Sequence, residues 1–311
     1  MLDEPTSGVS AEEKFEVMDI AMDAFARQEV TVLFVEHDME LVERYANRVL
    51  AFYNGLVIAD TDTREALADP QVREYVVGRE IHRTHAPQGI VSQYLFPSTA
   101  LLDPELTLGL PAHVTAATGM DALIHAVEAF TSKNATTISD MLARQAMQLI
   151  AKNLRTAYAD GSNLEARSNM LEGSLLAGMA FCTAGVTAVH AFAYPIGAEF
   201  HIPHGVANSI MLAPVMEFNK LGNLERFGEI AGYLGENTSG LSVRHAACAA
   251  VEAMRTLATD LKIPDHLSDF GIQDKDIPEL AAGVMKVTRL LANNPRELTQ
   301  KDAEAIYRSV L

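Results

Sequence analysis

Residues 118–130 read TGMDALIHAVEAF, a segment whose apolar residues cover a helix on nearly every side. A helix of this kind belongs in the core of a helical domain. Asp121 and His125 are four residues apart, so they share one face of that helix, about one turn apart. A charged aspartate there is costly to bury without a partner, and a cation bound by both side chains would be one partner. The alternative is that Asp121 bonds His125 or a backbone group, and the spacing alone favours that alternative.

A second segment, VHAFAYPIGAEFHIPHG at 189–205, contains three histidines. His190 lies in an apolar helical run that the Pro-Ile-Gly step at 195–197 is expected to end. His204 lies between a proline and a glycine, which indicates a fixed backbone that points the imidazole inward. His201 is expected to face solvent or to lie beside the ligands rather than to bind a metal.

Asp121, His125, His190 and His204 together provide one carboxylate oxygen and three neutral imidazole nitrogens. This donor set suits a first-row divalent ion, Fe(II) or Zn(II), and leaves a coordination position for a substrate oxygen. The histidine-rich segment therefore shifts the balance from an internal hydrogen bond to a metal site. We expect the two helices that carry Asp121 and His190 to face one another across a cleft.

Helical patterns follow one another from about residue 111, and strand patterns are nearly absent there. This part is predicted to be an all-helical domain. The expected helices cover 111–131, 136–159, 164–183, 185–194, 206–218, 222–235, 240–261, 275–291 and 300–310.

The first 80 residues have a different sequence pattern, in which strand and helix signals alternate. VTVLFVEH at 30–37 is typical of a buried parallel strand, and AFYNGLVIAD at 51–60 of a hairpin turning at Asn-Gly. The fold class is therefore mixed, with a short α/β segment before the all-α domain. We expect the divisions at 1–80, a junction at 81–94, and 95–311.

Composition excludes several classes of function. The net charge of −17 and the lack of a basic face argue against nucleic acid as a partner. No apolar run reaches the ~20 residues of a membrane span, and the N-terminus lacks the features of a signal peptide. Cys182 and Cys248 are expected to be buried, reduced thiols, which favours a cytoplasmic location.

The motifs resemble a known family. LFPSTALLDPELTLGLPAHVTAATGMDALIHAVEAF, AVHAFAYPIGAEFHIPHGVANSIMLAPVMEFN and the ending LLANNPRELTQKDAEAIYRSVL are similar to the C-terminal domain of the iron-containing (group III) alcohol dehydrogenases, over about 95–311. The resemblance implies a metal on Asp121, His125, His190 and His204. It also implies hydride transfer between a small alcohol or aldehyde and NAD or NADP, and it leaves a homo-oligomer open.

One position departs from the family pattern. Many members carry a second histidine four residues after the first loop ligand, where it passes a proton to solvent, and this chain has Tyr194. A phenol can relay a proton, but with a pKa near ~10 it is a poor shuttle at neutral pH. Tyr194 could instead only line the pocket. Four apolar residues are further candidates for the pocket wall, although such residues more often belong to the core: Met120, Phe130, Phe192 and Phe200.

The first 80 residues carry a second resemblance. MLDEPTSGVS, followed by VTVLFVEHD, is similar to the distal part of an ABC-transporter ATP-binding subunit of the branched-chain amino-acid type. The resemblance implies nucleotide-site roles for Asp3, Glu4 and His37. The chain has no G-x-x-x-x-G-K-[ST] loop to cradle a triphosphate and no LSGGQ-like signature, so ATP hydrolysis is not expected.

The chain therefore looks like a fusion of two partial proteins. Residues 1–94 also lack a glycine-rich dinucleotide turn, so we expect an incomplete dehydrogenase that binds NAD or NADP weakly. Two other interpretations stay open. One is an ATP-binding fragment of an amino-acid transporter, and the other is a metal-binding fragment without catalytic activity.

Overall fold

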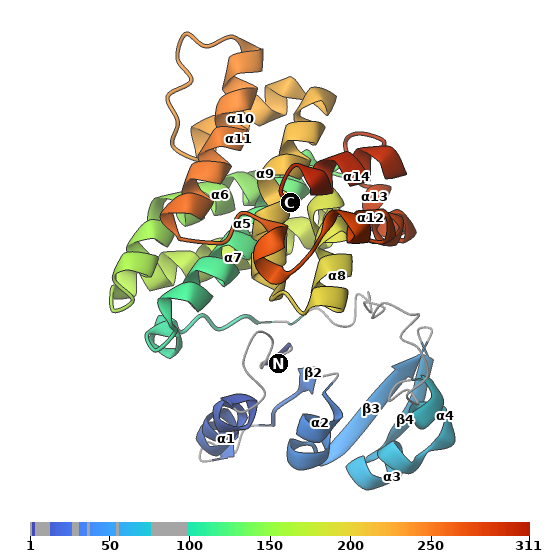
Figure 1. Ribbon diagram of the computed structural model, residues 1–311. Helices are drawn as coiled ribbons and strands as arrows, with labels where there is room; N and C mark the ends of the chain where they lie inside the picture. Colours follow the sequence, from blue (N-terminus) through green and yellow to red (C-terminus); the bar gives the residue numbers. More distant parts are fainter. Residues whose placement is uncertain are drawn as a thin grey trace. The chain divides into compact units, whose positions relative to one another are not determined.

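The computed structural model describes residues 2–3, 13–26, 31–35, 38–53, 56–75, 97 and 99–311. The chain divides into two compact units, Met1–Ser98 and Thr99–Leu311. Figure 1 labels most of the helices and strands.

The first unit combines short strands and helices, as its alternating sequence pattern predicts. Strands β1 and β2 pair in parallel, and β3 and β4 pair antiparallel. The described elements are β1 (Leu2–Asp3), α1 (Glu13–Ala26), β2 (Phe34–Val35), α2 (Met39–Tyr45), β3 (Arg48–Tyr53), β4 (Leu56–Asp62), α3 (Thr63–Ala68) and α4 (Pro70–Tyr75).

The predicted hairpin is confirmed, because β3 and β4 are paired up to Tyr53 and Leu56. Parallel pairing of β2 is also confirmed, with Phe34 opposite Leu2. The predicted burial of this strand is wrong, since Leu33 and Val35 are each about half exposed. These two side chains share one face of the strand, and only the opposite face is partly covered.

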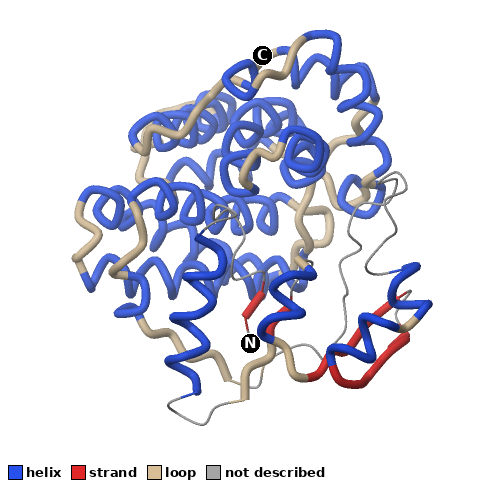
Figure 2. The backbone as a smooth tube through the Cα atoms, turned by 60° about the horizontal axis from the view of Figure 1, so that its bottom comes forward, coloured by secondary structure: helices blue, strands red, loops and turns tan. Residues whose placement is uncertain are grey.

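The second unit is helical throughout its regular structure, and the strands drawn in Figure 2 all lie in the first unit. The predicted all-helical domain is therefore confirmed. Its α-helices are α5 (Ala112–Thr131), α6 (Thr137–Ala159), α7 (Leu164–Ala184), α8 (Ala188–Phe200), α9 (His204–Asn219), α10 (Leu224–Tyr233), α11 (Val243–Asp260), α12 (Ile277–Lys286), α13 (Thr288–Leu291) and α14 (Gln300–Arg308). Short 3₁₀ turns are η2 (Pro104–Thr107), η3 (Lys220–Gly222), η4 (Leu267–Phe270) and η5 (Asp274–Asp276).

Local sequence explains where several of these helices begin. Thr136 and Ser139 form a reciprocal capping box at the start of α6. The Asn163 side chain accepts the backbone N–H of Ala166 at the start of α7. Such caps satisfy N–H groups that the first helical turn leaves unpaired.

Helix α8 differs from its predicted range, because it continues through Pro195 to Phe200. Pro195 is buried against α12, where a Cβ at Gly283 would lie 3.0 Å from the proline Cγ. Burial of this ring offsets the backbone hydrogen bond that proline cannot make. The helix ends at His201, whose φ of 54° is left-handed. The exposed side chain of His201 agrees with its predicted position facing solvent.

Two other predictions are corrected. The helix expected at 275–291 is divided into η5, α12 and α13, because Val287 has ψ of 53° and interrupts the helical path. Cys182 is exposed rather than buried, since it lies on the side of α7 away from Ala177, Ala180 and Ala184. Both Cys182 and Cys248 are free thiols, as predicted, but Cys248 is only partly buried.

Helix α5 forms the centre of the second unit and packs against α6, α7 and α9. Leu123, Ile124 and Val127 on one face of α5 are fully buried, and so is Ala129 on the opposite face. Burial of each of the three larger side chains contributes about 1.5–3 kcal/mol. The uniform apolar character of 118–130 thus predicts a central helix correctly, and this helix brings Asp121 into the middle of the unit.

The described helices also bear on membrane insertion. None of them alone has the length and apolar composition of a membrane span. Helices α7 and α8 reach this length and apolar composition only when they are taken together, and the chain bends by 103° between them.

Candidate metal centre

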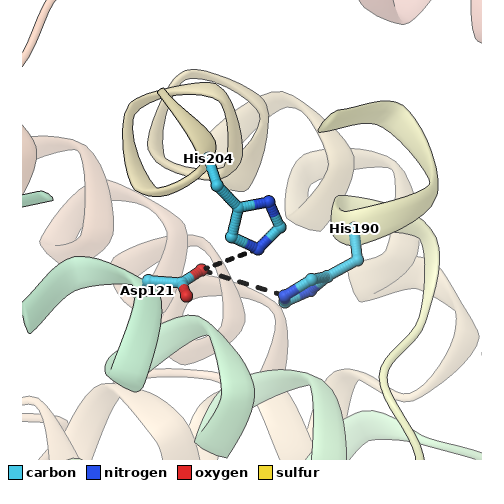
Figure 3. A group of neighbouring side chains, drawn as sticks. All are labelled: Asp121, His190 and His204. Carbon is cyan, nitrogen blue, oxygen red and sulfur yellow. Dashed lines mark ion pairs between the residues drawn. The ribbon is translucent and has the colours of Figure 1, made fainter. Parts of the chain in front are cut away.

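Three helices bring Asp121, His190 and His204 together (Figure 3). Asp121 lies in α5, His190 in the first turn of α8, and His204 is the first residue of α9. The Nε2 atoms of His190 and His204 lie 3.8 and 3.9 Å from Asp121 Oδ1. One potential ligand atom from each residue lies within 4.8 Å of the other two. Segments about 70 to 80 residues apart in sequence therefore converge at this point.

His125 lies next to this group but is not one of its three members. Its ring stacks on the His190 ring, with 4.7 Å between centroids, and on the Phe181 ring at 4.5 Å. Burial lowers the pKa of His125 to about 4, despite the opposing effect of Asp121. Its imidazole is therefore neutral at pH 7, which is the form that binds metals. That His125 is the fourth ligand stays a prediction.

The position of His204 depends on the close approach of α9 to α5. Pro203 precedes the helix, and Gly205 is its second residue. A Cβ at Gly205 would lie 2.5 Å from the carbonyl oxygen of Ala117, one turn before Asp121. The absence of a side chain at Gly205 thus lets the start of α9 rest on the backbone of α5. The His204 side chain remains 44% exposed, so the centre is accessible from that side.

Glu128, whose role was not predicted from the sequence, is fully buried in α5. Its Oε2 lies 2.5 Å from His190 Nδ1. Its Oε1 accepts hydrogen bonds from the Thr187 hydroxyl and from the backbone N–H of Val189. The available signal was a carboxylate within the apolar segment 118–130, where an unpaired charge is costly.

Asn208, which was also not predicted from the sequence, lies one turn after His204 in α9 and is fully buried. Its Nδ2 donates to Asp121 Oδ1 at 2.7 Å and lies 3.0 Å from His204 Nε2. The i, i+4 spacing of His204 and Asn208 could have indicated a shared face, but the partner on α5 could not be inferred.

The electrostatics of the group favour an ionised carboxylate. Burial acts to raise the pKa of Asp121, but the neighbouring imidazoles and the Asn208 bond outweigh it, and the pKa lies below its usual value. Burial acts to lower the pKa of His190, but Glu128 and Asp121 outweigh it and raise this pKa. Asp121 therefore attracts positive charge into the centre, as a divalent ion would require.

The residues present fit a divalent metal. His190 Nε2 is buried and has no hydrogen-bond partner among the described residues. An unpaired buried nitrogen is costly unless something else occupies its lone pair. One carboxylate with imidazole nitrogens is a donor set that Fe(II) and Zn(II) accept.

Tyr194 lies beside the group, with its ring centroid 6.4 Å from that of His190 and 6.2 Å from that of His204. Burial raises the pKa of its phenol, which makes proton exchange at neutral pH still harder. The four apolar residues suggested for the pocket wall belong to the core instead. Met120, Phe130 and Phe192 are fully buried, and Phe200 packs against the core partly buried.

Only one of the three residues of the ATPase-like motifs lies among the described residues. Asp3 lies in β1, opposite Val35 of β2, and nothing is described of its side chain. Glu4 and His37 lie outside the described residues. Their suggested nucleotide-site roles stay predictions.

Comparison with known proteins identifies the second unit. Residues 115–311 match the model of the Fe-containing alcohol dehydrogenase family, C-terminal. The 1,3-propanediol dehydrogenase of Citrobacter freundii is 48% identical over 219 residues, which are 70% of this chain and 56% of that protein. A crystal structure of a 1,3-propanediol oxidoreductase is similar with a TM-score of 0.66 and 47% identity, covering 67% of this chain and 55% of that chain.

A further solved structure adds a cofactor to the comparison. The sulfoacetaldehyde reductase of Bifidobacterium kashiwanohense, solved in complex with NAD⁺, is similar with a TM-score of 0.64 and 34% identity. That similarity covers 71% of this chain and 56% of that chain. The chain thus spans about half the length of the proteins it matches. Because the family model covers well over half of the sequence, the chain belongs to the Fe-containing alcohol dehydrogenase family through its helical domain.

Proposed function

We propose that the helical domain is the metal-binding half of an alcohol dehydrogenase. The observation that carries this proposal is the convergence of Asp121, His190 and His204 around a buried nitrogen without a hydrogen-bond partner. These three residues would hold Fe(II), with His125 as a fourth ligand. When bound, a divalent ion polarises an alcohol or carbonyl oxygen and stabilises alkoxide character at neutral pH.

The surrounding residues define what the chain itself contributes. Asp121 supplies the negative charge, and Asn208 fixes its Oδ1 by a 2.7 Å hydrogen bond. Helix α8 excludes water from one side, because His190 and its neighbours Ala191 and Phe192 are buried. The exposed edge of His204 is the side from which a small substrate can approach.

The proposed substrate is a small alcohol or aldehyde that exchanges hydride with NAD or NADP. The relatives named for 1,3-propanediol and sulfoacetaldehyde support this class, and the NAD⁺ complex of the reductase supports the cofactor. In such a reaction the cofactor supplies the redox chemistry, while the protein supplies position and electrostatic field.

We further propose that this chain binds nicotinamide cofactors weakly. The matched region is 56% of the propanediol dehydrogenase, and 1–94 contain no G-x-G-x-x-G turn. Titration of NADH fluorescence with the full chain tests this directly, and the chain contains no tryptophan to interfere. Tight NADH binding or ordinary turnover of simple alcohols would contradict it.

Elemental analysis of the purified chain tests the metal site. Iron or zinc is expected near one equivalent in the natural sequence and to be lost in Asp121→Ala and His204→Ala. Asp265→Ala is a matched control, because Asp265 is 80% exposed and pairs with the neighbouring surface residue His266. Metal content without alcohol turnover would support the interpretation as a silent metal-binding fragment.

The first unit is proposed separately to derive from the distal part of an ABC-transporter ATPase, joined to the dehydrogenase part as a fusion. Two observations support this proposal. The two motifs resemble those of the ATPase, and the strands within them, β1 and β2, pair in parallel. No ATP hydrolysis is expected from the chain, since it has no phosphate loop. ATP turnover above background would favour the transporter interpretation instead.

A further inference from the structure

The position of one proton on His190 decides whether this residue can bind a metal. A neutral imidazole carries its proton on one nitrogen and a lone pair on the other. Nε2 is the nitrogen that faces Asp121 Oδ1 at 3.8 Å. A proton on Nε2 would remove the lone pair that the centre needs, so the proton must be held on Nδ1.

Glu128 is placed to hold that proton. Its Oε2 is 2.5 Å from His190 Nδ1, and its side chain is fully buried. Its Oε1 is 2.7 Å from the backbone nitrogen of Val189, which can only donate. A carboxylate accepts at both oxygens, so Nδ1 of His190 must be the donor to Oε2.

We propose that Glu128 is a positioning residue that keeps the His190 proton on Nδ1 and so directs the Nε2 lone pair toward Asp121 and His204. This inference rests on the proposed metal site. A buried carboxylate that orients a histidine in this way typically accounts for about 10–100-fold in metal affinity.

Glu128 also connects two of the three helices that carry the candidate ligands, α5 and α8. Thr187 is the N-cap of α8 but accepts no cap hydrogen bond with its own side chain. Instead, Glu128 of α5 accepts from both the Thr187 hydroxyl and the Val189 N–H. A negative charge at a helix N-terminus is favourable, so the same side chain stabilises the start of α8 and orients His190.

A purely structural role for Glu128 is the alternative, and Glu128→Gln separates the two. The glutamine keeps the size of the side chain, and its single oxygen remains opposite the N–H of Val189 and the hydroxyl of Thr187. Its NH₂ group then faces His190 Nδ1. Because an amide NH₂ only donates, Nδ1 must accept, and the proton moves to Nε2. A structural role predicts lower stability without this reversal.

The first test is ¹⁵N NMR of the metal-free full chain labelled at histidine. Spectra are recorded from about pH 9, where imidazoles of ordinary pKa are neutral, and at rising pH until the His190 ring shows one unprotonated nitrogen. His190 is assigned with His190→Gln. The natural chain is expected to carry the His190 proton on Nδ1, and Glu128→Gln to carry it on Nε2. The same tautomer in both chains, or a proton on Nε2 in the natural chain, would overturn the proposal.

The second test is Zn²⁺ affinity, measured by competition with a chelator. Glu128→Gln is expected to weaken binding about 10–100-fold. Thr187→Val is the matched control, because it removes one donor to Glu128 and leaves the His190 contact. It should lower the unfolding temperature and change affinity less than about 3-fold. Equal losses of Zn²⁺ affinity in Glu128→Gln and Thr187→Val would indicate that Glu128 has only a structural role.

The two proposals fail in different ways. If the natural chain binds no Zn²⁺, the proposed metal site is wrong, and the NMR experiment still decides the role of Glu128 in the metal-free protein. If Zn²⁺ binds equally well to the natural chain and to Glu128→Gln, the metal site stands and the positioning role of Glu128 is wrong.

Discussion

Gly205 at the start of α9 lies in backbone contact with Ala117 of α5. A Cβ added at Gly205 would be 2.5 Å from the Ala117 carbonyl oxygen and 2.8 Å from its carbonyl carbon. Backbone atoms in the middle of a helix cannot move aside as the end of a side chain can. This contact therefore sets how closely His204 approaches Asp121.

Gly205→Ala is expected to destabilise the helical domain by about 1–3 kcal/mol, the usual cost of overpacking. Because α9 must move away from α5, Zn²⁺ affinity should also fall by about 10-fold. Gly178→Ala in α7 is the control, since nothing lies within 4 Å of its added Cβ. In a helix interior that change should stabilise by roughly 0.5–1 kcal/mol. Urea unfolding followed by circular dichroism measures the stability of both variants. Equal changes in their free energies of unfolding would contradict the packing argument.

Arg226 anchors α10 to the end of α5. Its Nε donates to the Phe130 carbonyl at 2.8 Å, its Nη2 pairs with Asp140, and its guanidinium lies 4.1 Å from the centroid of the Phe130 ring. Arg226→Met should therefore cost about 2 kcal/mol in free energy of unfolding, since hydrogen bonds to charged groups contribute about 1.5–3 kcal/mol.

Arg155→Met provides the matched comparison for Arg226→Met. Arg155 pairs with Asp260 at 2.6 Å, but both side chains are nearly half exposed. Exposed pairs contribute about 0–1 kcal/mol, because water and salt screen them. The same urea experiment measures both variants. A larger loss in Arg155→Met than in Arg226→Met would show that burial does not decide the strength of these contacts.

The parts of the site that could be predicted are those encoded by local sequence. The spacing of Asp121 and His125 places them on one helix face, and the residues around His204 indicate a restrained backbone. Glu128 could not be assigned, because its partners Thr187 and Val189 lie about 60 residues away. A buried carboxylate within 118–130 shows that some partner is needed and does not show which one.

The fold follows the same division between local and distant causes. Helical periodicity identifies α5, α6 and α7, and capping residues also mark the starts of α6 and α7. The end of α8 could not be predicted, because Pro195 normally ends a helix and is retained here by burial against Gly283 of α12. The interruption at Val287 has no glycine or proline to mark it.

Tyr233 should report its environment in alkaline solution. Burial raises the pKa of Tyr233 to about 12, and its hydrogen bond to Glu229 adds to the shift. The unfolded chain ionises this phenol at the usual pKa near 10, so between pH 10 and 12 the unfolded state binds fewer protons. The contribution of Tyr233 to stability is therefore complete below about pH 10 and is lost as the pH rises toward 12.

The test compares the natural chain with Tyr233→Phe. The free energy of unfolding of the natural chain should decrease more steeply with pH above about 10 than that of Tyr233→Phe. The difference in tyrosinate absorbance between the two chains should appear with a midpoint near 12. A midpoint near 10 would show that Tyr233 is not desolvated in the folded chain.

Asn208 is expected to compete with a metal ion for His204. Its Nδ2 lies 3.0 Å from His204 Nε2, and an amide nitrogen can only donate. A neutral imidazole has one lone pair, so this contact must break before Nε2 can bind a metal. Asp121 Oδ1 has no such restriction, because a carboxylate oxygen accepts more than one partner.

Asn208→Ala should therefore raise Zn²⁺ affinity at about pH 7 by roughly 3- to 10-fold, the equivalent of one hydrogen bond. Its effect on stability should be small, because removing the buried Asn208 Oδ1, which has no hydrogen-bond partner in the described structure, offsets the loss of the hydrogen bond to Asp121. Asn153→Ala is the matched control, since Asn153 bonds Leu149 and Asn169 away from the centre. That variant should lose about 1 kcal/mol of stability and keep its affinity. A lower affinity in Asn208→Ala would mean that Asn208 orients Asp121 more than it blocks His204.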